Sequence, residues 1–246
     1  MTALTKLTRV EAKLLLRDKV SVALILLLPT ALTIAFGLIP GFKDPTEDLS
    51  GQSGIELIAA IAVALSITMI GLTILPTALA VYRERGILRR LGASPVRPRL
   101  LLGAQLQVYV AAIVLSIALV LGVGAAAVGL PMPAQFGGFV LAVVLGTLAL
   151  FAVGLFIAAV SGTQRAASAF GMSLFFPSLF LAGVYVPREA MPAVLRQIGD
   201  FTPLGAALQS VRDSWSGHLP SALHIGTMAG YAVVASLAAA RFFRWE

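Results

Sequence analysis

The amino-acid sequence predicts an all-α, polytopic membrane protein with six transmembrane helices and with both termini in the cytoplasm. Three observations predict this fold class: the composition, the spacing of charged residues, and the uneven distribution of Lys and Arg between loops. Of 246 residues, 59% are hydrophobic and only 12% are charged, and the mean hydropathy is +0.95. Soluble domains carry roughly 45–50% apolar and about 25% charged residues. So few charges cannot cover a soluble core, and the surplus apolar surface must therefore face lipid.

The charged residues divide the chain into apolar segments. Asp, Glu, Lys and Arg are absent from five stretches: 20–42, 57–82, 100–164, 166–187 and 214–240. A bilayer core of about 30 Å needs about 20 apolar residues in a helix. The long stretch holds two spans, because Gly129, Pro131 and Pro133 interrupt it. We therefore expect six spans, at about 20–39, 57–80, 104–128, 136–160, 167–186 and 220–240.

The loops differ sharply in charge. The N-terminal segment, the connection 83–99, Arg165 and the C-terminal residues hold 14 of the 18 basic residues. The remaining four are accompanied by seven acidic residues. Basic loops stay in the cytoplasm, so both termini are predicted inside and the protein is predicted in the cell membrane. The same bias accounts for the pI near 10.4, and no nucleic-acid partner is expected.

The N-terminal segment 1–19 can form an amphipathic helix on the membrane surface. Its basic residues recur at steps of three and four, which aligns them on one helical face: Lys6, Arg9, Lys13 and Arg17. Glu11 and Asp18 interrupt the apolar arc beside this face. The alternative is a basic flank that only sets the topology.

The connection 83–99 is larger than a simple turn requires. Ile87, Leu88 and Leu91 give a short helix an apolar edge, arginines give it a basic edge, and Gly92 followed by Pro95 ends it. The segment offers a compact, charged surface to a protein partner. Positive-inside anchoring is the alternative.

Motifs of catalysis are absent from the sequence. It has no G-x-x-x-x-G-K-[ST] loop for ATP phosphates, no H-E-x-x-H pattern for zinc and no G-x-S-x-G elbow. The two histidines, His218 and His224, read as polar residues at a helix mouth. The chain has no cysteine, which excludes disulfides and thiol chemistry. We expect no catalytic, cofactor-binding or metal-binding residues, and no enzyme activity in this chain.

Two segments resemble the ABC-2-type permeases, which are membrane subunits of one class of ATP-binding-cassette exporters and include daunorubicin-type drug-efflux permeases. The first reads ERGILRRLGASPV at 84–96, with LLG at 101–103, and is similar to the cytoplasmic loop of the family. The second reads LAGVYVPREAMP at 181–192, with FTPL at 201–204, and is similar to the segment after the fifth helix. With the six spans and the basic N-terminal segment, the resemblance covers the whole chain as one transmembrane domain, 1–246.

The resemblance implies that 83–99 is the coupling helix, seated on a separate ATPase subunit that binds ATP and Mg. The implied coupling residues are Arg83, Glu84, Arg85, Gly86, Ile87, Leu88, Arg89, Arg90, Leu91 and Pro95. Many family members have an acidic residue at the position of Arg89 and Ser or Thr at that of Ile87. These departures make the electrostatics of the contact particular to this chain's own partner.

The second motif implies that 187–219 re-enters the membrane from outside as short helices. The residues that carry this motif are Gly183, Tyr185, Pro187, Met191, Pro192 and Pro203. Within the second and fifth spans, Pro76 and Pro177 are candidate hinges, and ordinary membrane packing is the alternative.

These features predict an exporter permease for a hydrophobic or amphipathic substrate such as a drug, lipid or glycan, with a role in drug efflux and antibiotic resistance. Six spans are half of the usual transport unit, so a second permease chain, in a homo- or heterodimer, is implied by the resemblance. A membrane scaffold or assembly factor that recruits a partner through 83–99 is the alternative from another class. A secondary carrier is the third possibility, which the lack of ionisable residues inside the spans disfavours.

Overall fold

The computed structural model describes residues 3–46, 49, 51–87, 90 and 98–242, and within these residues the chain folds into helices without a named strand. Six helical segments are long and apolar enough to cross a membrane, which confirms the predicted all-α fold class. The first two spans are composite: α2 (Lys19–Val22), η1 (Ala23–Leu27) and α3 (Leu28–Gly37), then α4 (Gly54–Thr68), η3 (Met69–Ile74) and α5 (Leu75–Glu84). The other four are α7 (Pro98–Val128), α8 (Phe136–Val160), α9 (Gln164–Ala182) and α12 (Ala222–Phe242).

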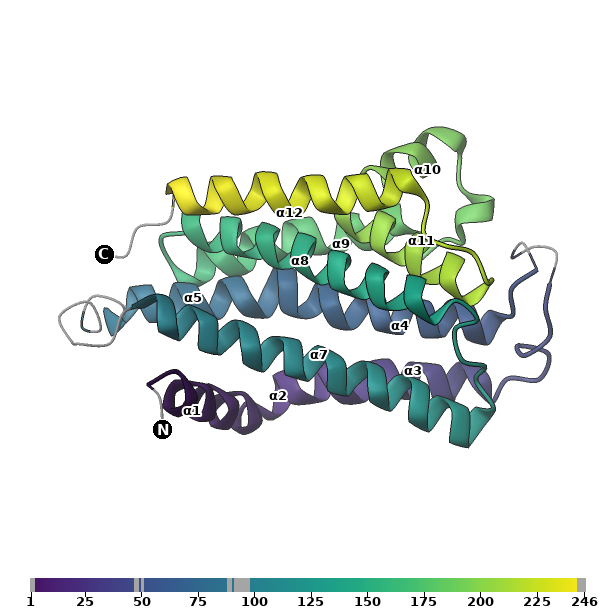
Figure 1. The fold of residues 1–246 in the computed structure, drawn as a ribbon, viewed down its shortest axis with the longest axis horizontal. Coiled ribbons are helices and arrows are strands. Elements are labelled where there is room, and N and C mark those ends of the chain that lie inside the picture. The colour runs from purple at the N-terminus through teal and green to yellow at the C-terminus, as the bar shows by residue number, and fades with distance from the viewer. Residues whose placement is uncertain (1–2, 47–48, 50, 88–89, 91–97, 243–246) are drawn as a thin grey trace.

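The second span lies at the centre of the helix bundle (Figure 1). In its most apolar 18-residue stretch 72% of the residues are buried, against 11–50% for the other five spans. The start of α1 (Ala3–Arg17), the end of α5 and the end of α12 lie at one end of the bundle, and α10 (Ala193–Asp200) and α11 (Pro203–Trp215) lie at the other. Both described ends of the chain thus lie on the same side, which the positive-inside rule predicts to be cytoplasmic.

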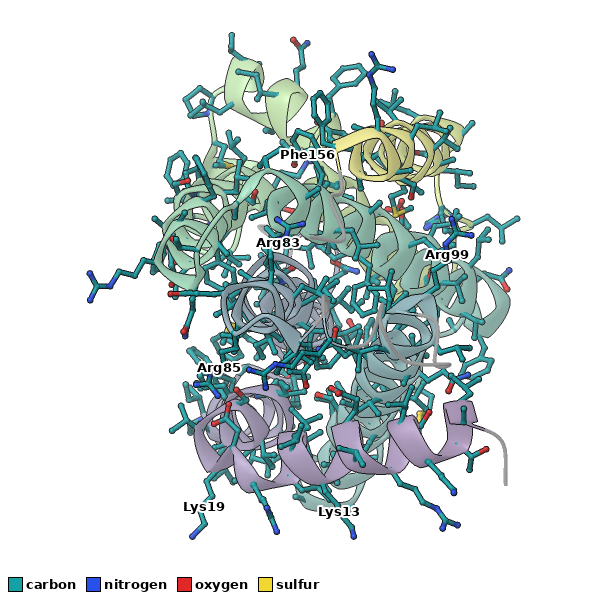
Figure 2. All side chains as sticks on the ribbon, turned by 90° about the vertical axis from the view of Figure 1, so that its left-hand side faces the viewer. Lys13, Lys19, Arg83, Arg85, Arg99 and Phe156 are labelled. Atoms are coloured by element: carbon teal, nitrogen blue, oxygen red, sulfur yellow. The ribbon has the colours of Figure 1, made fainter. Side chains whose placement is uncertain are left out.

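Helix α1 does not run parallel to the spans. Figure 2 views the bundle from the end that holds the termini, and α1 crosses this view while the spans are seen nearly end-on. The side chains of Lys13 and Lys19 project away from the bundle. This orientation is the one that a surface helix needs in order to keep its cations in water or lipid headgroups.

The first two spans share a local irregularity. Each contains a π-helical segment, η1 or η3, followed within two residues by a proline, Pro29 or Pro76. A proline has no N–H for the carbonyl four residues earlier, so the Ile25 carbonyl loses that partner. Ser116 of α7 replaces it, donating its hydroxyl to the Ile25 oxygen at 2.7 Å. A neighbouring span thus satisfies the backbone group that the proline releases.

Near Pro76 the released carbonyls lie against glycines. A Cβ atom added to Gly154 of α8 would overlap the Gly71 carbonyl oxygen, and one added to Gly171 of α9 would overlap that of Leu72. Only glycine permits such backbone contact. The central span is therefore packed directly against the backbones of α8 and α9 at its irregular turn.

The observed second span, Gly54–Glu84, is longer at both ends than the predicted 57–80. At its start Ser53 and Glu56 form a capping box, in which each side chain binds the other residue's backbone N–H. The sequence-based bounds stop short of the charged residues that flank the span, whereas the observed helix includes Glu56 and Arg83. The fourth span, Phe136–Val160, has the predicted bounds.

Candidate functional site

The predicted coupling residues begin where the second span ends. α5 ends at Glu84, and Gly86 has a φ of 66°, a left-handed conformation that glycine adopts without strain. The N–H of Arg90 donates to the Gly86 carbonyl at 3.1 Å. Four predicted coupling residues lie outside the described part of the chain: Leu88, Arg89, Leu91 and Pro95.

Arg83 binds the end of α8. Its Nη1 donates to the carbonyl oxygens of Ala158 and Ser161, both at 3.0 Å. The last carbonyls of a helix lack intrahelical partners and carry partial negative charge, so a guanidinium there stabilises the helix end. In Figure 2, Arg83 lies among the helix ends, inside the outline of the bundle.

Glu84 binds the start of the next helix. Its Oε2 accepts the backbone N–H of Gln164, the first residue of α9, at 2.9 Å. A carboxylate is favourable at a helix N-terminus for the same electrostatic reason. Arg83 and Glu84 thus hold both sides of the α8–α9 turn, and the contact with an ATPase that the resemblance implies for them stays a prediction. Arg85 and Arg90 are exposed and Ile87 is half-buried, and their predicted docking role stays a prediction.

Helix α1 packs against α7 and directs one carboxyl inward. Glu11 is only 7% exposed, and its Oε1 accepts the Tyr82 hydroxyl at 2.8 Å. Glu11, which interrupts the apolar arc of the N-terminal segment, therefore faces the bundle. Burial raises the pKa of the Glu11 carboxyl, although the Tyr82 hydroxyl and then the nearby Gln105 amide favour its charged form.

A cavity of about 370 Å³ lies beside Glu11, between α1, the second span, α7 and α9. Its polar lining residues are Glu11, Asp18, Ser21, Thr73, Thr77, Tyr82, Gln105, Tyr109, Gln164 and Ser168. Gln105 is 1% exposed, and neither of its amide atoms has a hydrogen bond of accepted geometry. Sequence reasoning missed this cavity, since its walls come from four separated segments.

The re-entrant motif forms short helices at the opposite end of the bundle. Gly183, with a φ of 91°, ends α9 at Ala182, earlier than the predicted residue 186. The three prolines of the motif each stand at the start of a short helix: Pro187 before Arg188–Ala190, Pro192 before α10, and Pro203 as the first residue of α11. Tyr185 is exposed and Met191 is buried.

Helix α11 is buried among α4, α8, α9 and α12, and it carries a buried arginine. The Nε of Arg212 donates to Gln52 at 2.9 Å, and its Nη2 forms a 2.7 Å ion pair with Glu189. Gln52 returns a hydrogen bond from its Nε2 to the Arg212 carbonyl at 2.9 Å. This network joins the loop between the first two spans to the segment 187–219, and the sequence offered no signal for the pairing.

A second polar cluster stands nearby. One carboxylate oxygen of Asp200 lies 2.5 Å from Arg188 Nη2 and 3.0 Å from His224 Nε2. The described residues contain no group of three potential metal ligands. The polar contacts of this end therefore join α10, α12 and the 188–190 turn to one another.

The architecture defines a class: a six-span membrane protein with a surface helix before the first span and short helices, of which α11 is buried, before the last. A sequence profile of the ABC-2 type transporter matches residues 2–215, which is most of the chain, and the protein belongs to this family. No curated protein matches the chain significantly. The protein is accordingly a multi-pass membrane permease component of an ABC transporter, expected in the cell membrane, and not a catalytic domain.

Proposed function

We propose that this chain is the membrane subunit of an exporter that moves a hydrophobic or amphipathic substrate outward with ATP hydrolysed by a separate ATPase subunit. The observation that carries the proposal is the double anchor at the end of α5: Arg83 holds α8 and Glu84 holds α9. The loop that follows resembles the coupling helix of the family. An ATPase that displaced this loop would move the α8–α9 turn with it. Two permease chains, identical or different, complete the transporter, and the ATPase binds ATP and Mg.

The central span supports such a movement through its irregular turn. η3 and Pro76 interrupt the regular hydrogen bonds between α4 and α5, so the cytoplasmic part of the span can tilt against the rest. Pro177, inside α9, is the second proposed hinge. The substrate path would then lie beside α8 and α9, the helices that move when the loop after α5 moves.

Site-directed photo-crosslinking in native membranes tests the ATPase contact. A photoreactive amino acid at Arg85, which is exposed beside the loop, should capture a protein whose peptides contain a Walker-type nucleotide-binding motif. The same probe at Leu38, which is exposed directly after the end of α3, is the control. Capture of no ATPase at Arg85, or equal capture at Leu38, would contradict the proposal.

Reconstitution of the permease with the captured ATPase in liposomes tests the coupling. Arg83→Ala and Glu84→Gln should leave the complex assembled and lower substrate-stimulated ATP hydrolysis on the order of tenfold, the scale of a typical coupling energy. Arg165→Ala removes an exposed cation near the same turn and should have no effect. A complex that hydrolyses ATP but moves no compound would favour the scaffold alternative.

A further inference from the structure

The cavity beside Glu11 differs in charge from the surface around it. Its described lining residues include two carboxylates, Glu11 and Asp18, and neither Lys nor Arg. The exposed charged residues at the same end of the bundle are mostly basic, such as Lys13 and Arg85. A cavity with acidic walls attracts a cation and repels an anion.

Gln105 adds a requirement for hydrogen bonding. Its side chain is almost fully buried against the cavity, yet both amide atoms lack a hydrogen bond of accepted geometry. Buried amides are normally satisfied, because an unmade hydrogen bond costs about 1–3 kcal/mol. The amide nitrogen lies close enough to the Glu11 carboxylate to favour its charged form, and an ammonium donor in the cavity would satisfy the amide oxygen.

The remaining walls suit a cation that is attached to an apolar body. Tyr82 and Tyr109 are among the residues that line the cavity, and aromatic side chains attract ammonium groups. Leu15, Ile74 and Val108 provide apolar surface in the same cavity. Because α1 forms one wall, the cavity stands at the depth where a surface helix meets the bundle.

We propose that this cavity binds the ammonium group of a cationic amphiphile, held by the Glu11 carboxylate and the Gln105 amide, with its apolar part against α5 and α7. The proposal names the substrate class of the proposed exporter and, as a transport site, rests on the proposed function. The ammonium group can come from a free amphiphilic amine or from an aminolipid headgroup.

Fluorescence binding to the purified full chain in phosphatidylcholine nanodiscs tests this site without ATPase or ATP. The probe is a dansylated dodecyl chain with a terminal ammonium group, and its N-acetylated form is the neutral match. The ammonium probe should bind saturably and at least about tenfold more tightly than the acetylated form, the factor that 1.4 kcal/mol represents. Equal affinity for the two probes would overturn the proposal.

Two substitutions assign the binding to the cavity. Glu11→Gln keeps an oxygen for the Tyr82 hydroxyl but removes the charge, and should weaken the ammonium probe about tenfold while leaving the acetylated probe unchanged. Gln105→Leu fills the position with an apolar group of similar size, should not lower the thermal stability, and should also weaken the ammonium probe. Asp44→Asn, at an exposed acid outside the cavity, is the control. Unchanged affinity in both cavity variants would exclude this site.

Nanodiscs that contain phosphatidylethanolamine distinguish the two sources of the ammonium group. Displacement of the probe by this lipid indicates an aminolipid headgroup, and retention of the probe indicates a free amine. Binding of the ammonium probe without ATP-driven export by the reconstituted complex would disprove the proposed function and leave the site intact. Export without selective binding of the ammonium probe would disprove the site and leave the proposed function intact.

Discussion

Gly154 and Gly171 show how the centre of this protein is packed, through contacts between backbones instead of large side chains. Gly154→Ala places a methyl group on the Gly71 carbonyl oxygen, and the backbone on either side must move. We expect a loss of about 1–3 kcal/mol, the usual cost of overpacking, seen as a lower unfolding temperature in detergent.

The control for this substitution is Gly122→Ala in α7, where an added Cβ meets no atom within 4 Å. It should leave the unfolding temperature unchanged or raise it slightly, because alanine is the better helix former. If both variants unfolded at the same temperature as the unmodified protein, this result would contradict the close packing of α8 against the second span.

Arg212 makes a second prediction at this scale. Arg212→Met removes the guanidinium that binds Gln52 and Glu189, and leaves the Gln52 amide oxygen without its donor. Hydrogen bonds to charged groups contribute about 1.5–3 kcal/mol each, so the unfolding temperature should fall by several degrees. Arg165→Met, at an exposed arginine, should leave it unchanged, and a similar fall in both variants would argue against a specific network.

Single residues are also where sequence reasoning reached its limit. The N-terminal pattern identified a surface helix with a basic face, but it could not show that Glu11 turns inward, because its partner Tyr82 lies 71 residues away. Arg83 and Glu84 were predicted to be coupling residues from their motif. Their partners on α8 and α9 are separated from them by about 80 residues, and no local pattern encodes such a contact.

Among the helical elements, α5 has Pro76 as its second residue and directly follows the π-helical segment η3. Pro76→Ala restores an N–H that can bond within the helix, so the second span should become more regular and at least as stable. In the complex with the ATPase, substrate-stimulated ATP hydrolysis should nevertheless fall severalfold, because the proposed hinge has become stiffer. Thermal unfolding and ATPase assays on the same preparation measure the two effects.

Pro40→Ala is the matched control for the hinge, since Pro40 is exposed outside the helices. It should change neither the stability nor the coupling. Full coupling in Pro76→Ala would mean that Pro76 serves packing alone.

The elements could be predicted from sequence to different extents. The six spans follow from composition, because a membrane requires about 20 apolar residues per helix and charges mark the ends. The π-helical segments did not follow, since no propensity distinguishes them from α-helix. One signal was present: LPTAL occurs at both 28–32 and 75–79, after each of the two π segments. The sequence analysis noted Pro76 and missed Pro29.

For the whole molecule, the orientation in the membrane can be tested directly because the chain has no cysteine. Lys13→Cys and Arg241→Cys should react with a membrane-impermeant maleimide only after the cytoplasmic face is opened. Lys43→Cys should react in intact cells, because it lies in the loop predicted outside. Labelling of Lys13→Cys in intact cells would contradict the predicted topology.

The composition was sufficient to predict that the protein spans a membrane, but the way in which the other helices pack around the second span required the structure.

The two π-helical segments have a consequence for rotation. A π turn holds one residue more than an α turn, and each residue of an α-helix represents about 100° of rotation about its axis. If η3 closed into an α-helix, α5 would rotate by about that angle relative to α4. Because Pro76 has no backbone N–H, closing η3 into an α-helix would require one fewer backbone hydrogen bond to change its acceptor. This rotation would carry Tyr82 away from Glu11 and Arg83 away from the end of α8. A change of helical register in the middle of the second span would thus make side chains at the end of α5 exchange their partners.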